Sequence, residues 1–162
     1  MRLFAAVLPP ASAASELADL VASVPAKGHQ LDEVPPDEMH LPITSFGNVA
    51  LNDSRSLARA LQADVATWAP VSLRFAGGAA LEWRGDESVW AKLDGDVDGL
   101  KIIGHGVPRS VQRLGFFVDR RQFRPWLAVG TITDHTTAPY LQSLVDGLNA
   151  LEGQTWTLTE VV

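Results

Sequence analysis

Two short segments of the sequence have residue types and spacing that could support chemistry. The first is residues 40–47, in which His40 and Thr44 alternate with apolar residues. Successive side chains of a strand point to opposite faces, so the even-numbered residues are expected to share one face. Imidazole exchanges protons near neutral pH, and a hydroxyl on the same face can hold an anion. The residues on this face are His40, Pro42, Thr44 and Phe46.

The second segment, residues 124–131, combines a cation with an aromatic ring. Trp126, Ala128 and Gly130 are expected on one strand face, where two small residues leave a recess beside the indole. The guanidinium of Arg124 matches phosphate geometry, and an indole can stack on a planar ligand such as a base. Two interpretations of Trp126 stay open, because the ring either stacks a ligand or fills the groove.

Positive charge is concentrated around this second segment. The chain has 13 Lys+Arg and 19 Asp+Glu over 162 residues, a formal charge of −6. Long duplex nucleic acid and anionic membrane are therefore excluded as partners, since such binding needs many clustered cations. Between residues 99 and 133, however, Asp119 is the only acid, so a small phosphorylated ligand remains compatible. The basic residues of this range are Lys101, Arg109, Arg113, Arg120, Arg121 and Arg124.

Hydrophobic periodicity predicts the elements that must position these segments. Strands are expected at 3–8, 39–49, 71–75, 81–84, 89–93, 116–118, 124–133 and 155–161. Helices are expected from Ser12, from Asp53 or Ser54, from Pro108, and over 141–151, with a loop at 27–38 and a turn at Gly77-Gly78. This order predicts a single α+β domain over residues 1–162, with residues 94–99 as a connector between two lobes.

At His40-Leu41-Pro42-Ile43-Thr44-Ser45-Phe46-Gly47 and Arg124-Pro125-Trp126 the chain resembles the 2H phosphoesterase superfamily. It is most similar to the 2′-5′ RNA ligase branch, the RNA 2′,3′-cyclic phosphodiesterases. That family carries two His-x-Thr/Ser motifs, the second preceded by Arg-Pro, and residues 2–10 also resemble its first strand. The resemblance implies two pseudo-symmetric lobes of antiparallel sheet, helices on the outside and a central groove.

The resemblance also implies which catalytic groups are missing. In the family, two histidines act as general base and general acid on a cyclic or 2′-5′ phosphodiester, and the hydroxyls hold the phosphate without a metal or other cofactor. Only His40 is retained, because Pro42 and Ala128 replace the hydroxyls and Trp126 replaces the second histidine. An indole N–H donates a hydrogen bond but does not exchange protons at physiological pH. The family reaction is therefore expected to be absent or vestigial.

The remaining polar clusters give weaker indications. His29, His105 and His135 are expected in loops from which each could approach the groove. Residues 94–99 match the first six positions of a calcium loop, but the twelfth position is His105 where a bidentate Glu is needed. No metal site is therefore expected. The apolar run 3–8 is too short for a signal peptide, which favours a cytoplasmic protein.

Three functions remain open from the sequence. The chain can be an inactive member of this fold that binds a nucleotide, an RNA end or another phosphorylated ligand through Thr44, Arg121, Arg124 and Trp126. It can instead be a diverged phosphodiesterase with His40 as its sole acid–base group. The third alternative is a protein-interaction module whose groove is closed.

Overall fold

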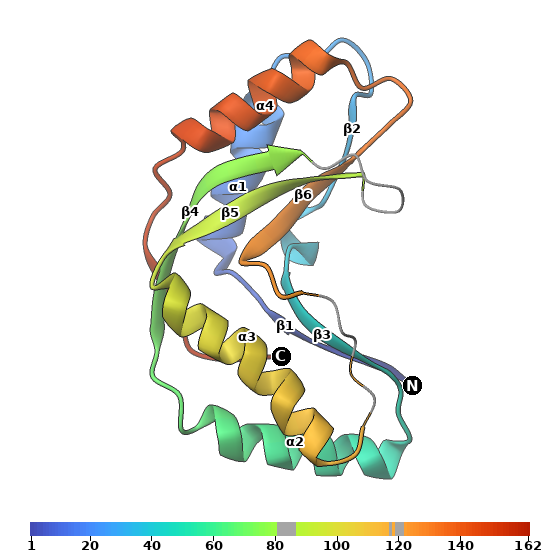
Figure 1. Cartoon of the computed structure of the whole chain (residues 1–162). Coiled ribbons are helices and arrows are strands. Elements are labelled where there is room, and N and C mark those ends of the chain that lie inside the picture. Colours follow the sequence, from blue (N-terminus) through green and yellow to red (C-terminus); the bar gives the residue numbers. More distant parts are fainter. Residues whose placement is uncertain (81–86, 117, 119–121) are drawn as a thin grey trace.

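The structure is a computed structural model that describes residues 1–80, 87–116, 118 and 122–162. It alternates short strands with four α-helices (Figure 1). In chain order the elements are β1 (Arg2–Val7), α1 (Ala11–Ser23), β2 (Leu31–Glu33), a 3-10 turn (Pro36–Glu38), β3 (Leu41–Asn48), α2 (Leu51–Val65), β4 (Val71–Ala80), β5 (Ser88–Gly95), α3 (Val97–Arg113), β6 (Trp126–Ile132), α4 (Ala138–Ala150) and β7 (Trp156–Leu158).

The strands form two antiparallel sheets. β1 pairs with β3 in a small sheet, and the large sheet has the order β2-β6-β5-β4-β7. β7 is one of the two outer strands of the large sheet, yet the residues that follow it return to the small sheet. There Ala6 and Val162 exchange two backbone hydrogen bonds of 2.9 Å. The C-terminus therefore ties the two sheets together.

Helices cover the sheets from outside, as the resemblance predicted. α1 and α4 contact each other and pack on β6 and β4, whereas α2 packs on α3, which contacts β3 and β4 (Figure 1). Apolar side chains from both sheets and from all four helices form one buried cluster. The α+β class, the antiparallel sheets and the outer helices are thus confirmed. A single domain whose lobes join at residues 94–99 stays a prediction.

The turn predicted at Gly77-Gly78 is wrong, because β4 continues through both glycines. Gly77 has φ of +99°, and the register of β4 against β5 shifts by one residue between Phe75 and Gly78, as in a β-bulge. Gly78 is needed for packing, since a Cβ there would lie 2.6 Å from the Cβ of Leu148 on α4. Gly77 allows a positive φ within the strand, and Gly78 allows α4 to pack closely against it. Neither glycine forms a turn.

The helix predicted to begin at Pro108 begins eleven residues earlier, at Val97. The Asp96 side chain caps it by accepting a hydrogen bond from the Gly99 amide at 3.0 Å. Pro108 lies inside the helix, where it cannot donate to the Gly104 carbonyl. Glycines 104 and 106 lower helix propensity but admit neighbouring aromatic rings, as described below, so packing outweighs propensity here.

The other boundaries differ less from the predictions. The predicted loop at 27–38 contains β2 and the 3-10 turn, and α1 and α2 begin one to three residues before their predicted caps. The predicted strands at 81–84 and 116–118 fall wholly or partly outside the described residues. Within the described ranges, every helix is too short or too polar to cross a lipid bilayer.

The contact between Gly78 and α4 predicts opposite effects for two Gly→Ala substitutions. Gly78→Ala forces Leu148 away and should lower the free energy of unfolding by about 1–3 kcal/mol. Gly147→Ala, inside α4, meets only the Leu20 Cδ1 atom at 3.6 Å and should raise it by roughly 0.5–1 kcal/mol. Urea denaturation measures both, and equal effects of the two substitutions would contradict this packing.

Candidate functional site

A cavity of about 850 Å³ opens between the small sheet and the part of the large sheet formed by β5 and β6. It brings the two sequence segments together, since residues from 40–45 face residues from 122–126 across it. The cavity is lined by Arg2, Phe4, Ala5, His40, Pro42, Ile43, Thr44, Ser45, Trp90, Gln122, Phe123, Arg124 and Trp126. We call it the central cavity.

His40 is held in an orientation that leaves one ring nitrogen available as a base. Its Nδ1 atom lies 3.0 Å from the backbone oxygen of Glu38. A carbonyl oxygen can only accept, so Nδ1 carries the hydrogen in this contact. In the neutral ring Nε2 is then the atom with the free lone pair. The Phe4 ring lies beside the imidazole, with 5.9 Å between centroids. The Nε2 atom is therefore the ring nitrogen with an available lone pair.

Trp126 forms part of the cavity wall and does not close the cavity. The Lys92 Nζ and the Arg124 Cζ each lie 5.2 Å from the centroid of its ring. Cations at this distance are attracted to the indole by about 0.5–1 kcal/mol each and orient it. The closed groove expected for an interaction module is thus not what the structure shows.

Two buried polar atoms in the cavity wall have no hydrogen-bond partner among the described residues. They are the Thr44 hydroxyl, on a residue 8% exposed, and the indole nitrogen of Trp90. The third such atom, on Trp156, lies elsewhere. An unsatisfied buried polar group costs about 1–3 kcal/mol, so natural proteins keep few of them. Their position at the central cavity is what a site for a polar ligand would show.

The side chains of β3 do not alternate as predicted. Between β1 and β3 the register shifts twice, so that Ile43 and Phe46 have no direct partner on β1. Each shift is a β-bulge, which changes the face to which later side chains point. Consequently Ser45 and Ile43 line the cavity, whereas Phe46 is buried in the core.

The recess predicted beside Trp126 is largely filled. Leu31 on β2 occupies the space next to Gly130, where a Cβ would lie 2.6 Å from two of its side-chain atoms. Ala128 is paired with Trp90 on β5 and does not line the cavity. The open space therefore lies on the β1–β3 side of Trp126 and not along β6.

The charge of the central cavity is positive. Arg2 and Arg124 line it together with His40, and none of its described lining residues is acidic. Arg121, which the sequence also assigned to this rim, lies outside the described residues, as does Arg120. The sequence reasoning missed Arg2, Phe4, Trp90, Gln122 and Phe123. The sequence does contain a signal for Trp90. It alternates in β5 with Val89 and Ala91, which are buried, so its side chain points to the opposite face of the sheet.

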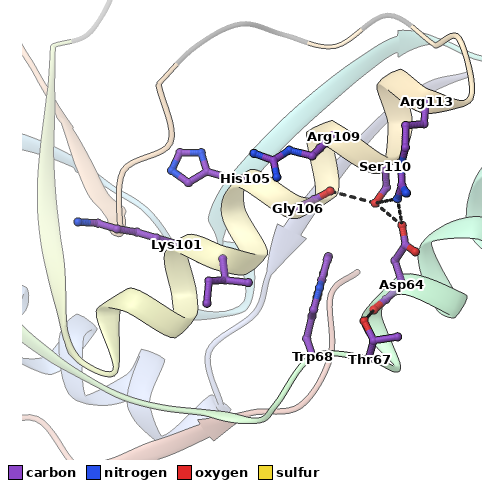
Figure 2. Close-up of a pocket in the computed structure, with 10 residues that line it drawn as sticks. Asp64, Thr67, Trp68, Lys101, His105, Gly106, Arg109, Ser110 and Arg113 are labelled. Atoms are coloured by element: carbon purple, nitrogen blue, oxygen red, sulfur yellow. Dashed lines mark hydrogen bonds and ion pairs between the residues drawn. The ribbon is translucent and has the colours of Figure 1, made fainter.

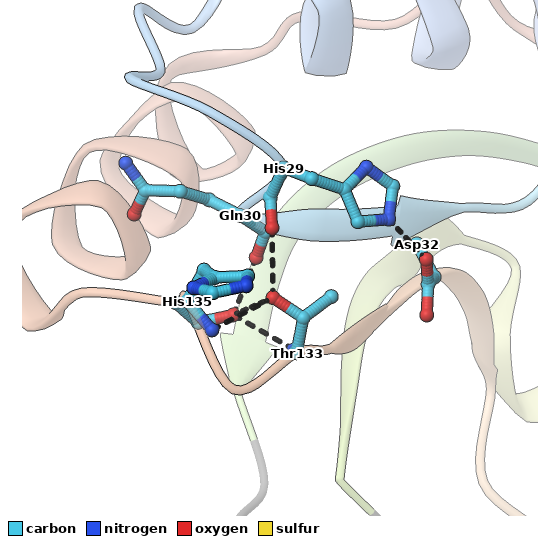
Figure 3. Close-up of polar contacts among 6 residues, drawn as sticks. His29, Gln30, Asp32, Thr133 and His135 are labelled. Atoms are coloured by element: carbon cyan, nitrogen blue, oxygen red, sulfur yellow. Dashed lines mark hydrogen bonds and ion pairs between the residues drawn. The ribbon is translucent and has the colours of Figure 1, made fainter.

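The other histidines lie away from the central cavity. His105 sits on α3 and lines a separate cavity between α3 and the end of α2 (Figure 2). His29 and His135 lie near Gln30 and Thr133 (Figure 3). These residues are at the end of β6 opposite to Trp126. The seven residues of β6 span about 20 Å, too far for either ring to share a ligand with His40.

The acidic stretch 94–99 has structural partners. The Gly95 amide and Arg74 both bond Asp94 and hold the pKa of its carboxyl below its usual value. Asp96 caps α3, as described above. These two carboxylates therefore serve the β4–β5 pair and the helix start.

Solved structures of known proteins share this fold. Escherichia coli LigT complexed with 3′-AMP aligns with a TM-score of 0.74 at 19% identity, covering 99% of this chain and 84% of LigT. TT0787 of Thermus thermophilus aligns with a TM-score of 0.73 at 18% identity, covering 99% and 86%. The MHV ns2 PDE domain gives 0.58 at 11% identity, covering 100% and 99%. No protein-family model and no curated protein sequence matches the chain.

At these identities the likeness establishes architecture, and it covers nearly the whole chain. The architecture is the one that the resemblance at His40 and at Arg124-Pro125 implied. This chain has the 2H phosphoesterase fold, the fold of LigT.

Proposed function

We propose that the central cavity binds a nucleotide, an RNA end or a similar phosphorylated ligand without hydrolysing a cyclic phosphodiester. The observation that carries the proposal is the Thr44 hydroxyl, which has no partner among the described residues and is buried in the wall of a cavity with two arginines and no described acid. A phosphate oxygen would accept the hydroxyl proton and would be attracted by the guanidinium groups.

The aromatic walls favour a ligand that also has a planar group. Phe4 is 59% exposed although it is large and apolar, and it lines the cavity with Trp90 and Trp126. A base lying against these rings would cover apolar surface, and base–aromatic stacking contributes about 1–3 kcal/mol. Structures of LigT complexed with 3′-AMP, ATP, NADP+ and phosphate support the same ligand class.

The proposal assigns no hydrolysis because acid–base work at a phosphodiester needs two proton-exchanging groups on opposite sides. His40 can remove a proton through Nε2, but Trp126 cannot supply one to the leaving oxygen. Pro42 and Ala128 also lack the hydroxyls that would hold the developing charge. Each missing group typically forfeits about 10²–10⁴ in rate. The alternative, a diverged phosphodiesterase with His40 as sole acid–base group, retains only the base.

Thr44→Val separates ligand binding from stability. The substitution keeps the shape of the side chain and removes the unsatisfied hydroxyl, so the free energy of unfolding should rise by about 1 kcal/mol. Affinity for 3′-AMP should fall about tenfold or more, because a hydrogen bond to a charged group is lost. Thr157→Val, which changes an exposed threonine of β7, is the matched control and should alter neither.

Calorimetric titration gives the affinity, and urea denaturation gives the stability. A Thr44→Val variant that binds 3′-AMP as the wild type does would contradict the assignment of this hydroxyl. If the wild type does not bind 3′-AMP, another nucleotide or inorganic phosphate, the proposed ligand class is wrong.

The wild type should show no hydrolysis of 2′,3′-cyclic nucleotides above the level of His40→Ala. His40 is exposed and its ring bonds only a backbone carbonyl among the described residues, so the substitution should leave the fold intact. Product formation is followed by chromatography at neutral pH. Turnover by the wild type that disappears in His40→Ala would favour the diverged phosphodiesterase instead.

A further inference from the structure

One face of α3 carries a row of basic side chains that the central cavity does not use. Lys101, His105, Arg109 and Arg113 follow one another at intervals of four residues. Four residues rise about 6 Å along an α-helix, so these side chains lie near one another, about one turn apart. All four are exposed or half-buried, whereas Leu100, Ile103, Val107 and Val111 are buried. We call this row the α3 basic face.

Among the described residues, the only acid that lines the cavity beside this face is already neutralised. Asp64, at the end of α2, pairs with Arg113 at 2.8 Å and also accepts the hydroxyl hydrogen of Ser110 (Figure 2). Lys101 and Arg109 make no hydrogen bond or ion pair within the described ranges. The cavity, of about 500 Å³, therefore has two cations without an ionic partner among the described residues.

An aromatic ring forms the other side of this cavity. Trp68 packs directly against Gly106 of α3, where a Cβ would lie 2.6 Å from its Cζ2 atom. Ile102, 62% exposed, lines the same cavity. The site thus combines cations with an apolar, aromatic surface. This combination is typical of proteins that bind single-stranded nucleic acid, in which cations follow the backbone and rings stack on bases.

Phe123 connects this cavity to the central one. It lines the central cavity and packs on α3 at Gly104, where a Cβ would lie 2.5 Å from its ring. The His105 ring meets it edge to face, with 6.1 Å between centroids. His105 in turn lines the α3 cavity. Aromatic and basic side chains therefore lead without interruption from the central cavity to the α3 basic face.

We propose that the α3 basic face binds the phosphodiester backbone of a single-stranded nucleic acid whose end lies in the central cavity. Lys101 and Arg109 contact phosphates, and Trp68 offers a face to a base. Arg109 follows Lys101 by eight positions, a rise of about 12 Å along the helix, which favours a chain of phosphates over one small anion. The inference rests on the proposed function, because it places the end of the strand in the nucleotide site.

The net charge of −6 limits such binding to this local face. Duplexes present a higher charge density but need many clustered cations, so a duplex of the same sequence should gain little affinity. Whether the strand is RNA or DNA depends on contacts to the 2′-hydroxyl, and ribose and deoxyribose strands of one sequence distinguish the two.

The test compares two double variants of the full chain. Lys101→Ala/Arg109→Ala removes the two cations of α3 that have no described ionic partner. Arg55→Ala/Arg59→Ala is the matched control, because it removes two exposed arginines four residues apart on α2 that line neither cavity. Alanine favours helix, so both variants should fold. Binding of 3′-AMP and of single-stranded RNA and DNA decamers with a 3′-phosphate is measured over a range of salt concentrations.

We expect the wild type to bind a decamer more tightly than 3′-AMP. Lys101→Ala/Arg109→Ala should lose about tenfold in decamer affinity at low salt and keep its 3′-AMP affinity. Its slope of log affinity against log salt should fall by about 1.4, or 0.7 for each lost phosphate contact. Arg55→Ala/Arg59→Ala should retain both the affinity and the slope.

Decamers that bind no tighter than 3′-AMP, or equal losses in the two double variants, would overturn the inference and leave the nucleotide site intact. In another outcome, the wild type fails to bind 3′-AMP while its decamer affinity still depends on Lys101 and Arg109. That result would overturn the proposed function alone. Absent binding of every probe would overturn both.

Discussion

The central cavity depends on the way the small sheet is held against the large one. β1 supplies Arg2, Phe4 and Ala5 to the cavity, and one edge of this strand is paired with β3. The other edge of β1 is hydrogen-bonded at Ala6 to Val162, which follows β7, an outer strand of the large sheet. Both sheets also share one apolar cluster. This arrangement fixes β3 opposite β6, so that His40 and Trp126 face a common space.

Under the proposed function, that space offers groups for binding but not a complete set for acid–base catalysis. By the resemblance, Pro42, Trp126 and Ala128 stand where the family has two hydroxyls and a second proton-exchanging ring. The Thr44 hydroxyl nevertheless remains buried without a described partner, at a cost in stability. A buried hydroxyl without a partner among the described residues supports the proposed ligand, because packing alone would favour valine. The same reasoning applies to the indole N–H of Trp90.

Much of this fold could be predicted from the sequence, because hydrophobic periodicity locates most strands and three of the helices. α3 was misplaced since its glycines and Pro108 lower helix propensity, while the rings of Phe123 and Trp68 require those glycines. The cavity was predicted in part. His40, Thr44, Arg124 and Trp126 do meet there, but the faces of β3 could not be read by simple alternation through two bulges. Arg2 and Phe4 were missed because only tertiary structure places β1 at the cavity.

We propose that the central cavity binds a phosphorylated nucleotide and leaves its phosphodiester intact. Phosphorus-31 NMR of 2′,3′-cyclic AMP with the protein tests both parts in one sample. We expect the cyclic phosphate resonance to shift or broaden as protein is added, and no monoester resonance to grow with time. A growing monoester resonance that is absent with His40→Ala would contradict the loss of catalysis. A cyclic phosphate resonance unchanged at every protein concentration would contradict the binding site itself.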